Sequence, residues 1–544
     1  MKRKHIKQAA LLLTMATCLM PTTQINAQFG GFNMGGFNMG DFKMEDMLPK
    51  VKHTKMEQLE SNLPVITITT DKPLTSEKKV MAKMKMEGYD GYIGIKLRGN
   101  SSLAFNQKKY TVETRDEDGN ELKASLLGMP AGSHWVLLSP YNDVSMIRDP
   151  FAFHLWREMG HWGPRTRMVE VLMDGEYLGI YILSEAIKRG TDRVNIDKMQ
   201  KTDTEGTALT GGYILRIDTY NEEDATFPSK VPGIGEGIMT SQITWSCIYP
   251  KKKNMQPEQQ QYIQNYVDEM EQVIQSPDFA DPKSGYAKYI DVPSFVDYFI
   301  HTELSLNADG YKRSAYFYKE RQHADGTGGK MFAGPVWDYN LAYGNCNFCN
   351  ANKIDAWCFE GGNTQPTPAL WQRLLQDPAF RKMVKTRYFE LRKGVMSDKA
   401  INAYIDNHVK LVEQAKDRHF KEYPELLVDE KQKKQQQQSS QQGGFGSMFG
   451  GFQMPEGFGG MQGFGGFGGM QGMGNGGTNV IAWYAAYQVS SYEEEIKVLK
   501  KWLADRLAFL DKNIARFDKD FEPHIQPPTE IKPQFNGGFP FMGF

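Results

Sequence analysis

The sequence lacks several features that would assign it to a common functional class. Its formal net charge is −1 over 544 residues, so no broad positive field attracts it to nucleic acid or to an anionic membrane. It contains no Gly-x-x-x-x-Gly-Lys-Ser/Thr loop, no Gly-x-Ser-x-Gly and no His-Glu-x-x-His. These absences argue against P-loop nucleotide hydrolases and against the serine hydrolases and zinc proteases that carry those motifs.

The sequence also lacks a long apolar run after its first residues, which predicts no transmembrane segment. Basic residues at positions 2–4 precede the apolar stretch 9–20, which is too short to span a membrane as a stable helix. Ala27 supplies the small residue of a cleavage site, so residues 1–27 are predicted to be a secretory signal peptide. The mature protein is therefore expected to be exported, to the periplasm, the cell surface or the extracellular space. A lipoprotein anchored at Cys18 is an alternative, but the residues around Cys18 lack the usual context.

Cysteine is scarce, and only Cys247, Cys346, Cys349 and Cys358 follow the signal peptide. In an oxidising compartment this even number favours disulfides. Cys346-x-x-Cys349 together with Cys358 is alternatively a zinc site, although a single Cys-x-x-Cys is a weak signal. Free thiols are the third alternative.

Three segments, 29–44, 443–477 and 535–544, consist largely of Gly, Phe and Met. Such sequence loses too much backbone entropy on ordering to form a packed core, which predicts disorder. Two interpretations stay open. The segments are passive linkers, or their spaced Phe and Met side chains make the protein self-associate.

The remaining sequence has the patterns of strands followed by helices. Apolar alternation predicts strands at 66–69, 92–97, 110–114, 135–138, 169–173, 177–183, 213–217, 315–318 and 331–332. Asp174-Gly175 predicts a hairpin turn, and Asp149-Pro150 predicts a helix with Asp149 as its N-cap. A helical pattern follows Pro257, and Ser491-x-x-Glu494 is a capping box. This order predicts an α+β, two-lobed architecture with a strand-rich N-terminal part and a helical C-terminal part.

Two acidic positions about thirty residues apart carry the chemical hypothesis. Asn307-Ala308-Asp309 ends the apolar helical stretch 295–306, and Asp338 lies in a strand-like turn after Trp337. Carboxylate and amide oxygens at two such positions can converge on one hard cation, as in phosphoryl transfer. Asp, Asn and Gly are also common in ordinary turns, which is the alternative interpretation.

A set of motifs occurs in an order that resembles the CotH kinase family. They are Arg98-Gly99-Asn100-Ser101-Ser102, Lys108-Lys109-Tyr110, Leu126-Leu127-Gly128, Trp135-Val136-Leu137-Leu138, Asp143 with Arg148, residues 174–181, Glu185 and Trp337-Asp338. The resemblance covers roughly residues 60–520 without the Gly-rich insert, and only the combined set is specific. The sequence departs from the family pattern at Asn340, where members often have a second Asp, and this either changes the metal affinity or leaves one ligand neutral.

The resemblance implies an atypical protein-kinase-like fold that uses ATP and Mg²⁺ or Mn²⁺ to phosphorylate Ser or Thr of partner proteins. It assigns the catalytic carboxylate to Asp309, and metal binding to Asp338 and, as a second ligand, Asn307. The implied nucleotide-binding residues are Arg98, Ser101, Lys108, Lys109, Arg148 and Glu185. Lys109 and Lys108 are alternatives for the phosphate-pairing lysine, and Arg148 and Glu185 have structural alternatives.

The expected organisation is a signal peptide (1–27), an arm and linker (28–60), a kinase-like domain (61–431), a Gln/Gly/Phe/Met-rich insert (432–478), a C-terminal helical part of the domain (479–518) and a tail (519–544). The expected partner is a protein substrate. The alternative function is non-catalytic assembly at a cell surface or coat, with the Gly/Phe-rich arms providing association.

Overall fold

The structure is a computed structural model that describes residues 51–218, 221–234, 242–347, 349–361, 366–428, 488–519 and 521–522. The predicted signal peptide and the three Gly/Phe/Met-rich segments lie outside the described residues.

Seven strands close into a barrel in the N-terminal part of the chain. Their order is β8-β6-β5-β4-β3-β2-β7, and β7 pairs with β8 to close the ring. All pairs are antiparallel except β2 with β7, and the short strand β1 adds to β8. The strands are β1 (Thr54–Lys55), β2 (Val65–Thr69), β3 (Val80–Met86), β4 (Tyr89–Arg98), β5 (Lys109–Arg115), β6 (His134–Leu138), β7 (Thr166–Met173) and β8 (Glu176–Glu185).

The barrel interior is a core of aliphatic and aromatic side chains that includes Ile95, Leu97, Tyr110 and Val112. Because successive side chains of a strand point to opposite faces, the residues adjacent to these core positions project from the outer face of the barrel. Arg98 and Lys109 are such residues, and they are paired across β4 and β5. The strand register therefore places two cationic side chains next to each other outside the barrel.

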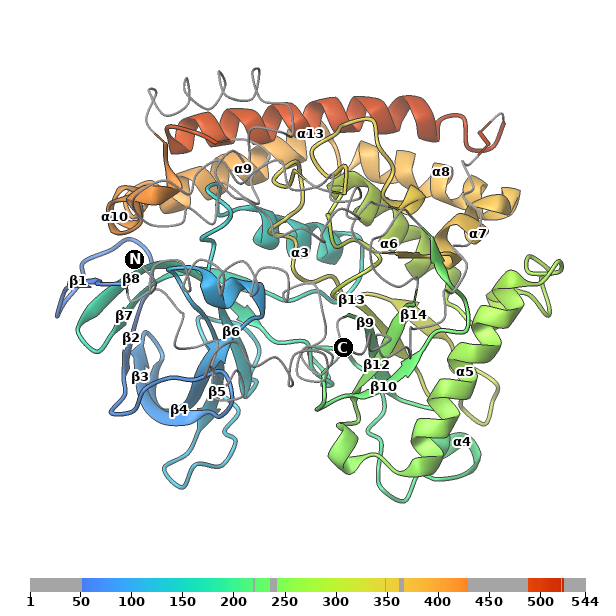
Figure 1. Cartoon of the computed structure of the whole chain (residues 1–544), viewed down its shortest axis with the longest axis horizontal. Coiled ribbons are helices and arrows are strands. Elements are labelled where there is room, and N and C mark those ends of the chain that lie inside the picture. The colour runs from blue at the N-terminus through green and yellow to red at the C-terminus, as the bar shows by residue number, and fades with distance from the viewer. Residues whose placement is uncertain are drawn as a thin grey trace, which may run out of the picture.

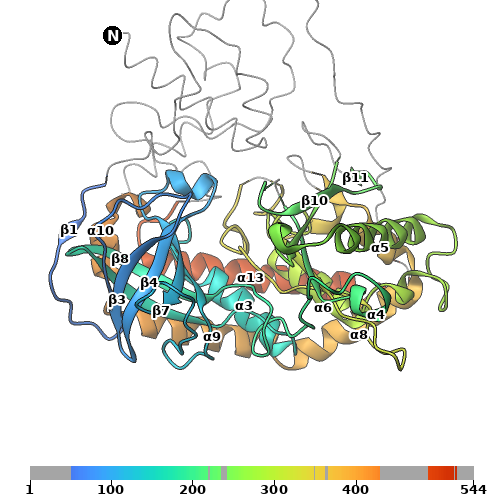
Figure 2. The ribbon, with the colours of Figure 1, turned by 90° about the horizontal axis from the view of Figure 1, so that it is seen from below.

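A second sheet has the order β10-β12-β9-β13-β14, and β11 and β15 form a separate small pair. Its strands are β9 (Tyr213–Ile217), β10 (Ala225–Pro228), β12 (Thr244–Tyr249), β13 (Ala315–Lys319) and β14 (Met331–Ala333), with β11 (Gly233–Ile234) and β15 (Thr367–Pro368). Figure 1 shows the barrel at one end of the molecule and this sheet with α5 at the other, and Figure 2 shows the same separation from below.

Helices connect the two sheets. They are α3 (Arg148–Glu158), α4 (Gly206–Leu209), α5 (Pro257–Gln275), α6 (Val292–Ser305), α7 (Leu370–Gln376), α8 (Pro378–Lys393), α9 (Asp398–Val412), α10 (Lys416–Glu422) and α13 (Tyr492–Ile514). Short 3₁₀ turns are η3 (Ser101–Ala104), η4 (Lys252–Asn254), η5 (Tyr286–Lys288), η6 (Cys358–Glu360) and η7 (Pro424–Leu426). The long helix α13 packs against α6, α8 and α9 and runs along one side of the molecule (Figure 1).

The α+β class is confirmed, and each predicted strand lies within or overlaps an observed one. Asp174 and Gly175 have φ of 52° and 74°, as a tight hairpin turn requires. The Asp149 cap is wrong. Helix α3 begins at Arg148 and its N-cap is Ile147, with no side-chain capping bond, so Asp149 lies inside the first turn.

The predicted disulfides are also wrong, because Cys247, Cys346, Cys349 and Cys358 are all thiols. In the described part of the chain, these cysteines do not converge as a group of three possible metal ligands either. None of the described helices combines the length and the apolar character that a membrane span requires.

His419 joins α10 to the barrel. Its Nδ1 accepts a hydrogen bond from the backbone N–H of Ile180 in β8 at 3.1 Å, and the side chain is fully buried. Burial lowers the pKa of His419 to about 3. The imidazole is therefore neutral in the folded protein over the whole range in which an unfolded histidine takes up a proton.

We expect the stability contribution of His419 to be present above pH 6.5 and to fall as the pH is lowered, because only the unfolded state binds the proton there. Relative to His419→Gln, wild type should lose up to about 1.4 kcal/mol of unfolding free energy per pH unit between pH 6 and 4. Urea unfolding of both proteins at several pH values measures this difference. His323→Gln is the control, because His323 is exposed and its replacement removes no buried imidazole. Parallel pH curves for wild type and His419→Gln would contradict the assignment.

Candidate functional site

The barrel meets the rest of the molecule at an ion pair between Lys109 and Asp338. The Nζ of Lys109 lies 3.7 Å from Oδ1 of Asp338. The lysine side chain is 9% exposed and the aspartate side chain 34%, so one charge is enclosed while the other is open to solvent. Lys109 comes from β5 and Asp338 from the segment that follows β14, so the pair forms only when both parts are folded.

The neighbouring Lys108 has a different role. Its Nζ donates hydrogen bonds to the carbonyl oxygens of Leu103 and Phe105, at 2.7 and 2.6 Å. Burial lowers the pKa of Lys108 to about 8. Lys108 therefore braces the turn between β4 and β5, and Lys109 is the lysine that faces the carboxylate.

The turn that Lys108 braces begins with Arg98. The Arg98 guanidinium lies 5.5 Å from the centroid of the Trp337 ring, in cation–π range and one residue from Asp338. Gly99 follows with φ of 127°, and a Cβ there would lie 2.0 Å from Ser102 Oγ, so the turn requires glycine. Ser101 starts η3, and the position of its side chain lies outside what the structure describes.

The acidic turn after α6, which contains Asn307 and Asp309, contacts the Asp338 segment. Leu306 caps α6 in the left-handed conformation with φ of 43°, which redirects the chain into Asn307 and Asp309. The side-chain amide of Asn307 donates from Nδ2 to the backbone oxygen of Asp338 at 3.2 Å. Its Oδ1 accepts from the backbone N–H of Asp309 at 3.3 Å. Asn307 thus ties the two acidic positions together.

The electrostatics of the two carboxylates fit a cation. Burial raises the pKa of Asp309, and the charges of Asp338 and Asp218 raise it further, whereas Arg313 and Lys312 lower it. Two neighbouring carboxylates that repel each other are stabilised by a hard divalent cation, which prefers oxygen ligands. The donor set of Asp338, Asp309 and Asn307 is therefore of the kind that Mg²⁺ and Mn²⁺ bind.

Asp149 is a member of this group that the sequence did not indicate. Its carboxylate is 4% exposed, and Oδ1 accepts a hydrogen bond from the backbone N–H of Tyr339 at 2.6 Å. Burial first, and then the charge of Asp338, raise the pKa of Asp149 to about 7, while Lys109 lowers it. The Asp-Pro pair is typical of a helix start, and no local pattern in the sequence shows that this carboxylate contacts a residue 190 positions away.

Asp218, at the end of β9, was missed as well. Its charge raises the pKa of Asp309, and its Oδ2 pairs with Nη1 of Arg216 at 3.1 Å. A lone aspartate after a strand carries no sequence signal for such a position.

Arg148, predicted to bind nucleotide, is fully buried inside the protein. Its Nη1 contacts Asp143 and lies 2.7 Å from Glu495 Oε1 in α13, and its Nε donates to the Ala342 oxygen at 3.1 Å. Arg148 therefore links α3 to the loop after Asp338 and to α13.

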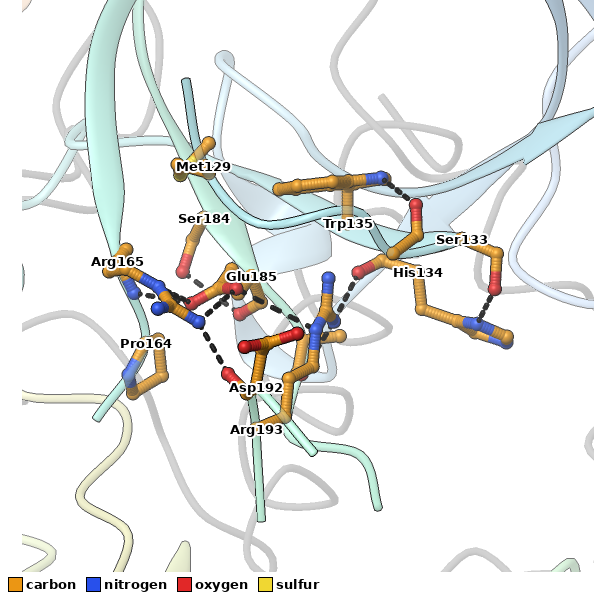
Figure 3. A network of polar contacts seen from close by, with 12 residues as sticks. Met129, Ser133, His134, Trp135, Pro164, Arg165, Ser184, Glu185, Asp192 and Arg193 are labelled. Atoms are coloured by element: carbon orange, nitrogen blue, oxygen red, sulfur yellow. Dashed lines mark hydrogen bonds and ion pairs between the residues drawn. The ribbon is translucent and has the colours of Figure 1, made fainter. Parts of the chain in front are cut away.

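Glu185, at the end of β8, is also fully buried and lies in a network of two arginines (Figure 3). Arg165 donates to it from Nε and Nη2, both at 2.8 Å, and Arg193 Nε lies 3.7 Å away. Arg193 in turn donates to the His134 oxygen at 2.7 Å. The Glu185 carboxylate thus holds Arg165, before β7, and Arg193, after β8, next to the end of β8. Among the predicted residues, the structure brings Arg98, Lys109, Asn307, Asp309 and Asp338 together, while Lys108, Arg148 and Glu185 contact other protein groups.

A separate cluster of possible metal ligands is found on the barrel. Glu113, Glu121 and His134 are the one group of three in the described chain whose ligand atoms lie within 4.8 Å of one another. Glu113 already pairs with Lys79 and, at 2.8 Å, with Arg115. Cationic side chains therefore compensate its charge, and we assign no metal to this cluster.

The acidic turn is supported from beneath by Glu303 and Arg506. Both side chains are fully buried, and Arg506 Nη2 lies 3.6 Å from Glu303 Oε2. Arg506 also donates to the carbonyl oxygens of Glu303, Ile354 and Ala356. Glu303 accepts from the backbone N–H groups of Cys358 and Phe359 and from the Tyr311 hydroxyl. Helix α13 therefore holds the base of the Asn307–Asp309 turn.

Comparison with known proteins identifies a family and a similar protein. Residues 95–510, more than half of the chain, match the sequence model of the family described as CotH kinase protein. The chain is also similar to the inner spore coat protein H of Bacillus subtilis (strain 168), with 23% identity over 335 residues that cover 60% of this chain and 80% of that protein.

The buried ion pair of Arg506 with Glu303 can be tested by substitution. Arg506→Met should lower the free energy of unfolding by about 3–5 kcal/mol, because it leaves the Glu303 carboxylate buried without its cation. Urea or thermal unfolding measures the change. Lys501→Met on the same helix is the control, since the Lys501 side chain is 77% exposed and its pair with Asp505 should contribute less than about 1 kcal/mol. Equal losses for the two variants would contradict the role given to Arg506.

Proposed function

The chain belongs to the CotH kinase protein family, and from this premise we propose that it is a metal-dependent protein kinase that transfers the γ-phosphate of ATP to Ser or Thr hydroxyls of partner proteins. The observation that carries the proposal is the ion pair of Lys109 with Asp338 beside Asn307 and Asp309. Protein kinases need the same elements, which are a lysine for the phosphates and Asp and Asn oxygens for the metal. In this proposal the barrel is the smaller lobe, and the second sheet with the helices is the larger lobe.

We assign metal binding to Asp338 and, as the second ligand, Asn307. A bound Mg²⁺ or Mn²⁺ supplies positive charge to the β- and γ-phosphate oxygens. For Asn307 to act as ligand, its Oδ1 exchanges the bond to the Asp309 amide for the metal. The amide Nδ2 keeps its bond to the Asp338 carbonyl, so the ligand stays oriented.

Lys109 and Arg98 are assigned to the phosphates of ATP. They lie side by side on the outer face of the barrel, and Lys109 already neutralises the carboxylate that would hold the metal. A guanidinium and an ammonium at this position match the charge of a triphosphate. Ser101 is assigned to the nucleotide from the family pattern alone. Lys108, Arg148 and Glu185 support the nucleotide site through the backbone segments that they hold.

Asp309 is assigned to the acceptor hydroxyl. Its raised pKa, caused first by burial, makes it a better proton acceptor than an exposed aspartate. Lys312 and Arg313 lie close enough to lower the pKa of Asp309. Their positive charges would stabilise the negative charge of the phosphoryl group during transfer.

We infer that the protein acts outside the cytoplasm on surface or coat proteins. The support is the predicted signal peptide and the similarity to a protein named for the inner spore coat. The same similarity favours a second candidate function, in which the protein assembles a surface layer without catalysis and its Gly/Phe/Met-rich segments provide association. Phosphoryl transfer that depends on Asp338 separates the two functions, because a pure assembly protein needs no cation at that carboxylate.

The kinase proposal is tested by label transfer from γ-labelled ATP with Mg²⁺ or Mn²⁺, to the protein itself and to extracted surface proteins. Lys109→Met and Asp338→Asn should each reduce the rate by about 100-fold or more, because each removes a charge that the transition state requires. Lys85→Met is the matched control, since Lys85 is an exposed barrel lysine that pairs only loosely with Asp90. No transfer by wild type, or equal transfer by wild type and Asp338→Asn, would refute the proposed function.

A further inference from the structure

The peptide group that joins Asp338 to Tyr339 is held by a hydrogen bond on each side. These two hydrogen bonds are called the grip below. The carbonyl oxygen of this peptide group accepts the hydrogen bond from Asn307 Nδ2 at 3.2 Å. Its N–H donates to Asp149 Oδ1 at 2.6 Å. Asn307 follows α6 and Asp149 belongs to α3, so two parts of the chain that are distant in the sequence hold one peptide plane.

The two hydrogen bonds lie next to a residue with an unfavourable backbone conformation. Asp338 has φ of 65°, the left-handed region that non-glycine residues rarely occupy. Such a conformation persists only when surrounding contacts impose it. Fixing the following peptide plane limits the backbone conformation of Asp338 and therefore the positions that its side chain can reach near Lys109.

The buried position of Asp149 next to Asp338 costs free energy, and helix capping does not account for it. Its carboxylate is 4% exposed and close enough to Asp338 for the two charges to interact unfavourably. It caps no helix, because the N-cap of α3 is Ile147. A buried carboxylate next to another one is disfavoured by desolvation and by repulsion, and such arrangements concentrate at functional sites.

We propose that Asp149 is a positioning residue for the phosphotransfer site, which holds Asp338 in its metal-binding orientation through the Tyr339 amide. The inference rests on the proposed function, because it takes Asp338 as a metal ligand. The hydrogen bond carries the role. An asparagine at position 149 keeps an oxygen acceptor for the amide, whereas an alanine does not.

Two measurements on the full mature chain test the proposal. Hydrogen–deuterium exchange over residues 336–342 reports the grip itself, and calorimetric titration with Mn²⁺ and adenylyl imidodiphosphate reports the site. Asp149→Ala should accelerate exchange in this segment and weaken Mn²⁺–nucleotide binding by about tenfold or more, as loss of a partner of a metal ligand does. Asp149→Asn should remain within about threefold of wild type in binding and should keep the slow exchange.

Glu271→Ala is the control for removal of a buried carboxylate. Glu271 accepts hydrogen bonds from the Ser229 hydroxyl, the Lys230 amide and the Trp245 indole, so its loss destabilises a different part of the fold. It should leave exchange over 336–342 and Mn²⁺–nucleotide binding at the wild-type values under conditions in which the protein stays folded.

The outcomes separate this inference from the proposed function. Wild-type binding by Asp149→Ala, or equally weak binding by both Asp149 variants, would overturn the positioning role. If Asp149→Ala does not fold, Asp149→Asn decides alone, because lost binding overturns the role and retained binding supports it. No Mn²⁺–nucleotide binding by wild type would refute the proposed function, and the role of Asp149 at a metal ligand would fall with it. The exchange data then still distinguish a protein with the grip from one without it.

Discussion

The ion pair between Lys109 and Asp338 is the interaction on which the candidate site depends. Exposed ion pairs contribute little to stability, but this lysine is largely enclosed and each partner is fixed by its own support. The β4–β5 register sets Lys109 beside Arg98, and a gripped peptide sets Asp338. The pair therefore reports whether the barrel and the second part of the molecule are correctly placed relative to each other.

The last described helix keeps that placement. Residues 427–491 separate η7 from α13 in the sequence, yet α13 contributes two fully or almost fully buried charged side chains. Glu495 pairs with Arg148 at the start of α3, and Arg506 contacts Glu303 beneath the Asn307–Asp309 turn. Both supports of the acidic residues thus end on one helix, so α13 packs into the part of the molecule that carries these residues.

The sequence predicted the elements better than their contacts. The alternation of the strands and the Asp174-Gly175 turn are local patterns, and the predictions made from them are confirmed. Closure of the barrel by the parallel pair of β2 with β7 is non-local, so no local pattern indicates it. The choice between Lys108 and Lys109 needed the direction of each side chain. Asp149 was hidden by the helix-cap interpretation, because its hydrogen-bond partner lies in a distant loop. The disulfide prediction failed because it used the compartment and the number of cysteines, and neither places two sulfurs within bonding distance.

The most direct measurement is a crystal structure of the mature protein with Mn²⁺ and a non-hydrolysable ATP analogue, using the anomalous signal of manganese. The account predicts a manganese peak within about 2.2 Å of an Asp338 carboxylate oxygen, with the Lys109 ammonium turned toward the nucleotide phosphates. A nucleotide and metal bound elsewhere, with the Lys109–Asp338 pair unchanged, would contradict it.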